Sequence, residues 1–270
     1  MSSSDDELKV VNPEHAPPKL DAAARADIEQ LARRQIAASG ILMKAINFVG
    51  GQVEDTLKFL PAGARNQIDD AARKSLRISY DMASKSRNGP MARAATTDGA
   101  HKALAAVSGA LGGIGGLPTA LIELPVATTM IFRAVQGVAT EYGEDPLSEE
   151  TRFQCLAVFG AGGPGTEDDG VDTSFIGARL GLTGAAVNGL ISRVAPKFAA
   201  VLSQKLASQS VPILGAVAGA GTNFAFIDYY VEVAHVHFGL RKLSRTYGAD
   251  AVDAAFHESL VAAKFPVSRA

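Results

Sequence analysis

A run of uncharged residues from Ala103 to Ile122, ALAAVSGALGGIGGLPTALI, constrains the fold more than any other part of the sequence. The run is long enough to span a bilayer, but its Gly-Gly pairs and Leu-Pro steps argue against a single straight membrane helix. Glycines four residues apart share one helix face and let a neighbouring backbone approach closely. The chain has three such pairs of glycines, and they predict either tight packing within the fold or contact with lipid: Gly109 and Gly113, Gly112 and Gly116, and Gly215 and Gly219.

Apolar residues elsewhere in the chain follow helical intervals, and no segment alternates with a period of two. Asp21 and Ser148 are suitable N-caps, while Pro125 suits the first turn of a helix that ends before Gly143. The sequence therefore predicts an all-α fold of closely packed Gly/Ala-rich helices. We expect a disordered tail over residues 1–20, locally basic helices over 21–98, a Gly-rich helical core over 99–265 and, within it, an irregular connector over 161–174.

The stretch LAVFGAGGPG, residues 156–165, resembles a strand that leads into a dinucleotide-binding loop. However, Phe153, Leu156, Ala157 and Gly160 recur at helical spacing, which indicates the end of a helix. The acidic residues TEDDG follow, where a dinucleotide loop needs a helix N-terminus directed at the pyrophosphate. The sequence predicts no bound cofactor here.

The formal net charge of -2 gives the whole molecule no field that favours nucleic acid. The single cysteine, Cys155, and an N-terminus without a secretory signal indicate a reducing, cytoplasmic location. One local imbalance stands out between residues 71 and 95, where six basic residues accompany Asp81. We interpret them as a docking face for an anionic membrane or as an ordinary solvated helix face: Arg73, Lys74, Arg77, Lys85, Arg87 and Arg93.

Two groups of polar residues interrupt the apolar segments. Glu123 lies within the longest apolar region, and we expect it either at an exposed kink or buried in an ion pair with Arg133. Asp228, Glu232 and His235 share one helix face, and Glu232 and His235 have the ExxH spacing of helical di-iron sites. A di-iron site needs a second ExxH, which the chain lacks. The polar face is therefore expected to form packing contacts or salt bridges, with a metal site as the alternative.

Catalytic motifs are missing from the sequence. It has no GxSxG elbow, no HExxH and no P-loop, and Cys155 has the apolar neighbours of an inert buried thiol. We therefore expect a protein that is not an enzyme.

Three stretches together resemble the EcsC family: GLPTALIELPVATTMIFRAVQGVATEYG, EDPLSEETRFQCLAVFG and PILGAVAGAGTNFAF. The resemblance covers roughly residues 30–260. Its most specific residues are Pro118 and Pro125, then Arg133 and the pair Tyr142-Gly143, followed at a distance by Pro212, Gly215, Gly219 and Asn223.

The resemblance implies a helical, Gly-rich protein associated with membranes or secretion. We expect a non-enzymatic protein on the inner face of a membrane, accessory to transport or secretion. The alternatives are a soluble module that binds a lipid or another apolar ligand, and a metal-dependent enzyme that uses Glu232 and His235.

Overall fold

The fold is described by a computed structural model that covers residues 17–50, 63–85, 121, 124–161, 183–209 and 215–264. Within these ranges every regular element is helical and no strand occurs, which confirms the all-α class. The helices are α1 (Ala22–Gly50), α3 (Ala64–Lys85), a helix over residues 124–141, α6 (Glu149–Val158), α7 (Gly184–Gln209), α8 (Gly215–Tyr247) and α9 (Ala249–Lys264).

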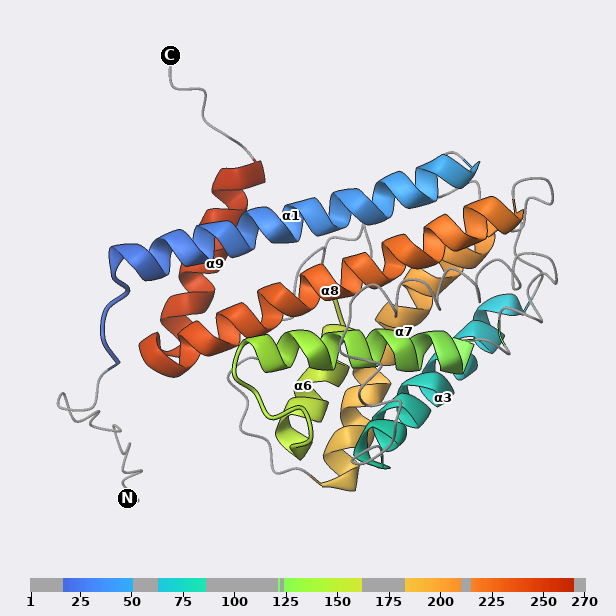
Figure 1. Ribbon diagram of the computed structural model, residues 1–270, viewed down its shortest axis with the longest axis horizontal. Coiled ribbons are helices and arrows are strands. Elements are labelled where there is room, and N and C mark those ends of the chain that lie inside the picture. The colour runs from blue at the N-terminus through green and yellow to red at the C-terminus, as the bar shows by residue number, and fades with distance from the viewer. Residues whose placement is uncertain are drawn as a thin grey trace, which may run out of the picture.

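Helix α8 occupies the centre of the arrangement (Figure 1). Helix α1 runs along one side of α8, and α9 packs across both of them. On the other side lie α6, α7 and the helix over residues 124–141, while α3 packs against α7. The two N-terminal helices α1 and α3 thus pack on partners from the C-terminal half of the chain.

The helix ends follow local signals in the sequence. The Asp21 carboxylate accepts a hydrogen bond of 2.8 Å from the backbone N–H of Ala24, and Ser148 caps α6 in the same way through Thr151. Gly143 has a φ of 81°, the left-handed conformation that glycine adopts without steric cost. These capping predictions are confirmed.

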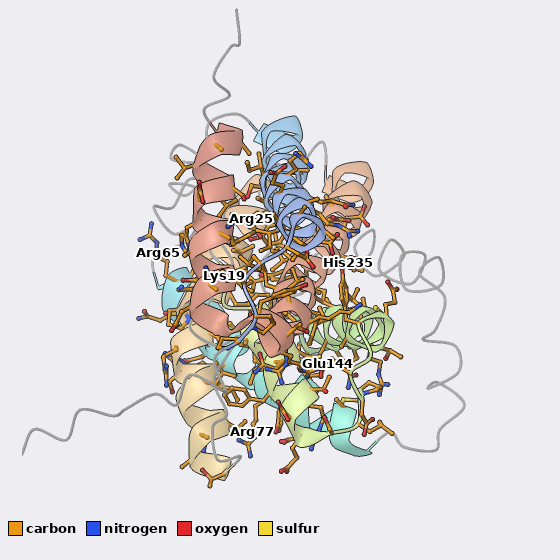
Figure 2. All side chains as sticks on the ribbon, turned by 90° about the vertical axis from the view of Figure 1, so that its left-hand side faces the viewer. Lys19, Arg25, Arg65, Arg77, Glu144 and His235 are labelled. Atoms are coloured by element: carbon orange, nitrogen blue, oxygen red, sulfur yellow. The ribbon has the colours of Figure 1, made fainter. Side chains whose placement is uncertain are left out.

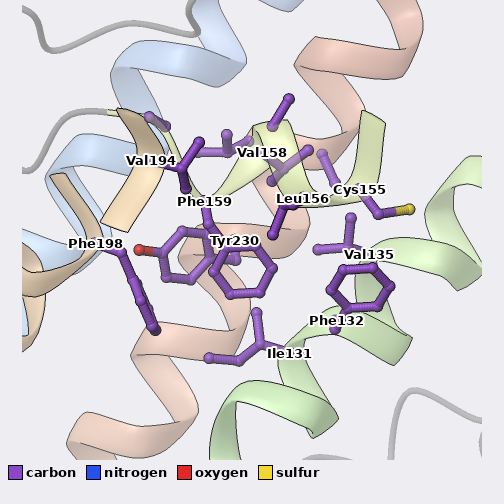
Figure 3. Packing of buried hydrophobic residues seen from close by; sticks show 14 of the residues in the cluster. Ile131, Phe132, Val135, Cys155, Leu156, Val158, Phe159, Val194, Phe198 and Tyr230 are labelled. Carbon is purple, nitrogen blue, oxygen red and sulfur yellow. The ribbon is translucent and has the colours of Figure 1, made fainter. Parts of the chain in front are cut away.

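An aromatic cluster forms the centre of the core (Figure 3). Phe159 follows α6 directly, and its ring centroid lies 5.1 Å from that of Phe198 on α7 and 5.0 Å from that of Tyr230 on α8. Gly160 comes next, and a Cβ at this position would lie 3.2 Å from the Cγ2 atom of Val194. The residues LAVFG therefore form the end of a buried helix that packs against α7 and α8, as their spacing predicts.

Several expected features lie outside the described residues. These are the tail up to residue 16, the divide between residues 98 and 99, and all of the expected connector beyond Ala161.

Candidate functional site

The predicted polar face of α8 is present and its side chains have partners. The guanidinium of Arg34 on α1 donates two hydrogen bonds to the Glu232 carboxylate, one of them 3.3 Å long between Nη2 and Oε1. This hydrogen bonding raises the pKa of Arg34. His235, one turn further along α8, has its Nδ1 atom 3.4 Å from the Tyr142 hydroxyl. Asp228 is half-buried on the same face and also has a partner.

These contacts favour the salt-bridge interpretation of the face over a metal site. Both carboxylate oxygens of Glu232 contact the Arg34 guanidinium, so the carboxylate already has a cationic partner. Among the described residues, no group of three His, Cys, Asp or Glu side chains is arranged to hold a metal ion.

A polar turn over residues 142–148 joins the helix over residues 124–141 to α6. Tyr142 begins the turn and contacts His235, while Gly143 supplies the left-handed backbone. The side-chain amide of Gln136 donates to the carbonyl of Pro146 at 2.9 Å, and the backbone N–H of Leu147 donates to the Asp145 carboxylate at 3.0 Å. The pair Tyr142-Gly143, which carries part of the family resemblance, thus fixes the geometry of this turn.

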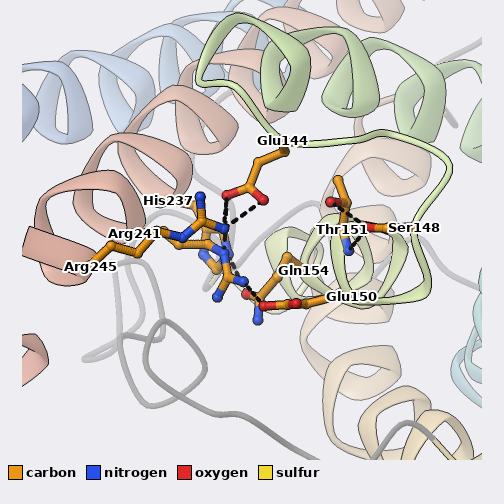
Figure 4. A network of polar contacts seen from close by, with 8 residues as sticks. All are labelled: Glu144, Ser148, Glu150, Thr151, Gln154, His237, Arg241 and Arg245. Carbon is orange, nitrogen blue, oxygen red and sulfur yellow. Dashed lines mark hydrogen bonds and ion pairs between the residues drawn. The ribbon is translucent and has the colours of Figure 1, made fainter.

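Four charged residues tie the polar turn and α6 to the C-terminal half of α8 (Figure 4). Glu144 accepts a hydrogen bond of 3.2 Å from Nε of Arg241 and another of 2.7 Å from Arg245. Arg241 also donates to Glu150 in the first turn of α6. The side chains of Glu144 and Arg241 are each 6% exposed, whereas those of Glu150 and Arg245 are about half exposed. We call Glu144, Glu150, Arg241 and Arg245 the clamp.

His237 lies beside the clamp, one turn before Arg241. Its Nε2 atom is 2.8 Å from Oε1 of Gln154 on α6, and both side chains are buried. Burial lowers the pKa of His237 to about 3, and the positive charge of Arg241 contributes further in the same direction. The imidazole is therefore neutral at physiological pH. His235 and His237 contact different partners, Tyr142 and Gln154, as expected for residues two apart on a helix.

Sequence reasoning missed the clamp and Gln154. A signal was present, because His237, Arg241 and Arg245 recur every four residues along α8. Such spacing places the three side chains along one ridge of the helix. The clamp fixes α6 and the polar turn against α8, with its charges committed to one another.

Cys155 lies in α6 and is completely buried in the core near Phe132 and Val135 (Figure 3). Burial raises the pKa of the thiol well above its usual range, so the sulfur is protonated and unreactive at neutral pH. This environment agrees with the predicted role as a small buried hydrophobe.

The predicted basic face is partly described. Arg73, Lys74 and Arg77 are exposed on α3 (Figure 2 labels Arg77), and Arg77 contacts both Asp81 and Asn188 of α7. The backbone of Lys85 ends α3, while Arg87 and Arg93 lie outside the described residues. The helix also contains Asp69 and Asp70, so its five basic residues, with Arg65 included, accompany three acidic ones. The imbalance is therefore milder than the six-to-one ratio counted from Ala71.

Helix α7 packs against α3 and extends its basic character. Its sequence contains Arg193, Lys197 and Lys205 and no acidic residue. Among the described helices, α7 alone has a stretch long and apolar enough to cross a membrane, Gly184–Ser203, and 50% of that stretch is buried in the fold. Core helices of soluble proteins often have the same length and composition.

The remaining predicted residues fall mostly outside the described parts of the chain. Gly109, Gly112, Gly113, Gly116, Pro118 and Glu123 lie there, so their packing or lipid contact stays a prediction. Gly215, Gly219 and Asn223 belong to the backbone of α8, whose side chains are described from Ala225 onward. Pro125 lies in the first described turn of the helix over residues 124–141. Arg133 in that helix is half-buried and has a partner.

The fold and these sites define an all-helical protein built around one long central helix, with polar side chains tied together beside it and basic side chains on two outer helices. The sequence matches the EcsC protein family over residues 17–170. This match covers more than half of the 270-residue chain, and the chain belongs to the EcsC family. The part of the expected resemblance over residues 171–260 lies beyond the matched range. No curated protein and no solved structure matches the chain.

Proposed function

We propose that the protein is a non-enzymatic accessory to transport or secretion that docks on the anionic inner face of a membrane through α3 and α7. The observation that carries the proposal is the position of α7. This helix has the length and apolar composition of a membrane helix, is only half buried, and lies beside the exposed basic residues of α3.

The charges of α3 and α7 support the proposal that these two helices face the membrane. Arg193 and Lys197 on α7 add to Arg73 and Lys74 on α3, and α7 contains no acidic residue. Each Lys or Arg near an anionic leaflet contributes about 1 kcal/mol of binding free energy. Asp70 and Asp81 oppose this attraction, so we expect reversible, salt-sensitive binding rather than permanent insertion.

Flotation of the purified protein with vesicles tests the proposal. We would compare phosphatidylcholine vesicles with vesicles that also contain phosphatidylserine, at low and at physiological salt. The test variant is Arg73→Gln with Lys74→Gln, because both side chains are exposed and their loss leaves the Arg77 contacts intact. A matched control, Lys19→Gln with Lys242→Gln, removes the same charge from exposed positions outside α3 and α7.

The wild-type protein should float with the anionic vesicles, and less so as salt increases. Loss of two charges at about 1 kcal/mol each should weaken partitioning roughly 30-fold, whereas the control should float like the wild type. Equal loss in both variants would mean that net charge, and not the α3 and α7 surface, governs binding. A wild-type protein that stays with the soluble fraction under all conditions would refute membrane docking.

A further inference from the structure

Arg152 is a buried arginine whose charge is poorly compensated. It is the fourth residue of α6, and its side chain is 9% exposed. Its ion-pair partner is Glu149, whose Oε1 atom lies 3.8 Å from Nη2, beyond hydrogen-bonding distance. Among the described residues, nothing accepts a hydrogen bond from the buried Nε atom. A charged donor is therefore enclosed in this part of the fold without an acceptor.

Two other arginines of the chain show what the same edge of a guanidinium binds. Arg34 directs its Nε and Nη2 atoms at the two oxygens of one carboxylate. Arg241 is about as deeply buried as Arg152. Its Nε atom donates to Glu144 and its Nη2 atom to Glu150. The two atoms form a fork that matches paired oxygens of a carboxylate or a phosphate, and Arg152 has the same fork.

The neighbours of Arg152 on α3 do not neutralise its charge. The Cζ atom lies 4.9 Å from the ring centroid of Tyr80. An aromatic ring attracts the positive charge, but it offers no oxygen acceptor to the N–H groups. Burial raises the pKa of Tyr80, so its hydroxyl carries no negative charge at neutral pH. The next residue, Asp81, accepts a hydrogen bond from Arg77. Because arginine stays charged in proteins, an oxyanion at the fork would remove the cost of this burial.

We propose that the Nε–Nη2 fork of Arg152 binds a small oxyanion, a carboxylate or phosphate group, between α3 and α6. Glu149 marks the route of entry, because its side chain is 62% exposed and lies beside Nη2. The oxyanion takes the place of the Glu149 carboxylate, which turns into solvent at little cost because exposed ion pairs contribute little to stability. A phosphate group can belong to a dissolved anion or to the headgroup of an anionic lipid.

Thermal unfolding in inorganic phosphate and in acetate tests the site, because an ion that binds only the folded protein raises Tm. Each anion replaces chloride at constant ionic strength, so that screening stays the same. Arg152→Gln removes the charged fork, and Glu149→Gln removes the competing carboxylate. Glu258→Gln is the matched control for Glu149→Gln, since it removes an exposed carboxylate from α9. Phosphate also stabilises folded proteins in general, so the difference between variants is the quantity of interest.

At least one of the two anions should raise the Tm of the wild type and of Glu258→Gln more than that of Arg152→Gln. Glu149→Gln should reach the wild-type increase at an anion concentration at least threefold lower, because nothing then competes for the fork. This comparison also decides the matter if Arg152→Gln does not fold. Equal responses of the wild type and Arg152→Gln, or of Glu149→Gln and Glu258→Gln, would refute the site.

Flotation with anionic vesicles then separates the two sources of phosphate. If the site holds a lipid headgroup, Glu149→Gln should float more than Glu258→Gln, although both variants lose the same charge. If it holds a dissolved anion, the two variants should float alike. The Tm measurement contains no lipid, so its outcome stands whether or not the protein docks on membranes through α3 and α7.

Discussion

Replacement of Glu144 by Gln should destabilise the protein more than the same replacement of Glu150. Glu144 is 6% exposed on its side chain and faces Arg241, which is equally buried. Gln keeps the shape of the side chain and removes its charge. Arg241 would then keep Glu150 as its remaining carboxylate partner, and Glu150 is 53% exposed.

The expected loss is about 3 kcal/mol of unfolding free energy. Removal of one partner from a buried ion pair costs about 3–5 kcal/mol because the other charge stays buried without compensation. The lower end applies because Glu150 still contacts Arg241. The same substitution at Glu150 removes an exposed carboxylate from the same guanidinium, and exposed ion pairs contribute less than about 1 kcal/mol. Glu150→Gln is therefore the matched control.

Urea unfolding followed by circular dichroism measures both variants. Glu144→Gln should lower the midpoint at unchanged m-value, and in a thermal melt it should lower Tm by roughly 6–12 °C. The double variant should lose more than the sum of the single losses, because Arg241 then has neither of these carboxylates. Equal effects at Glu144 and Glu150, each below about 1 kcal/mol, would show that water screens the pair and would refute the reasoning.

Two further perturbations test the helix α8 environment. Because the pKa of His237 is lowered to about 3 in the folded protein, the unfolded chain binds a proton below about pH 6.5 that the folded chain does not. The free energy of unfolding should therefore decrease by about 1.4 kcal/mol for each pH unit as the pH is lowered from 6.5 to 3. His237→Gln should remove this slope and the exposed control His257→Gln should keep it, as measured by urea unfolding at several pH values. Gly137→Ala, with nothing within 4 Å of the added Cβ, should stabilise its helix by about 0.5–1 kcal/mol. Gly239→Ala would place a Cβ 2.8 Å from a terminal methyl carbon of Leu31, which must move, so this variant should be the less stable of the two by up to about 1–3 kcal/mol. Equal melting temperatures for the two alanine variants would contradict the close contact of α8 with α1.

The sequence predicted the helical class and several helix ends well, since those signals are local. Asp21 and Ser148 cap their helices through backbone groups three residues away, and Gly143 adopts its left-handed conformation by itself. The shared face of Glu232 and His235 follows from helical geometry alone. The helical spacing of the apolar residues in LAVFG likewise indicated the end of a buried helix and not a strand that leads into a phosphate-binding loop.

The partners of the polar residues could not be predicted. Arg34 and Glu232 are 198 residues apart in sequence, Glu144 and Arg241 are 97 apart, and Gln154 and His237 are 83 apart. Periodicity places such residues on a face but does not say which helix will pack against it. For the same reason, the basic stretch could be recognised in the sequence, whereas its extension by α7 required the packed structure.

The sequence by itself thus determined where helices form and where several of them begin and end, because backbone hydrogen bonds and caps join residues three or four positions apart. Tertiary structure decided that Glu144 is buried and paired, that His237 is neutral, and that the Arg152 guanidinium is buried against Tyr80 of α3. These properties depend on burial and on charges brought together from distant parts of the chain, and both arise only when the helices pack.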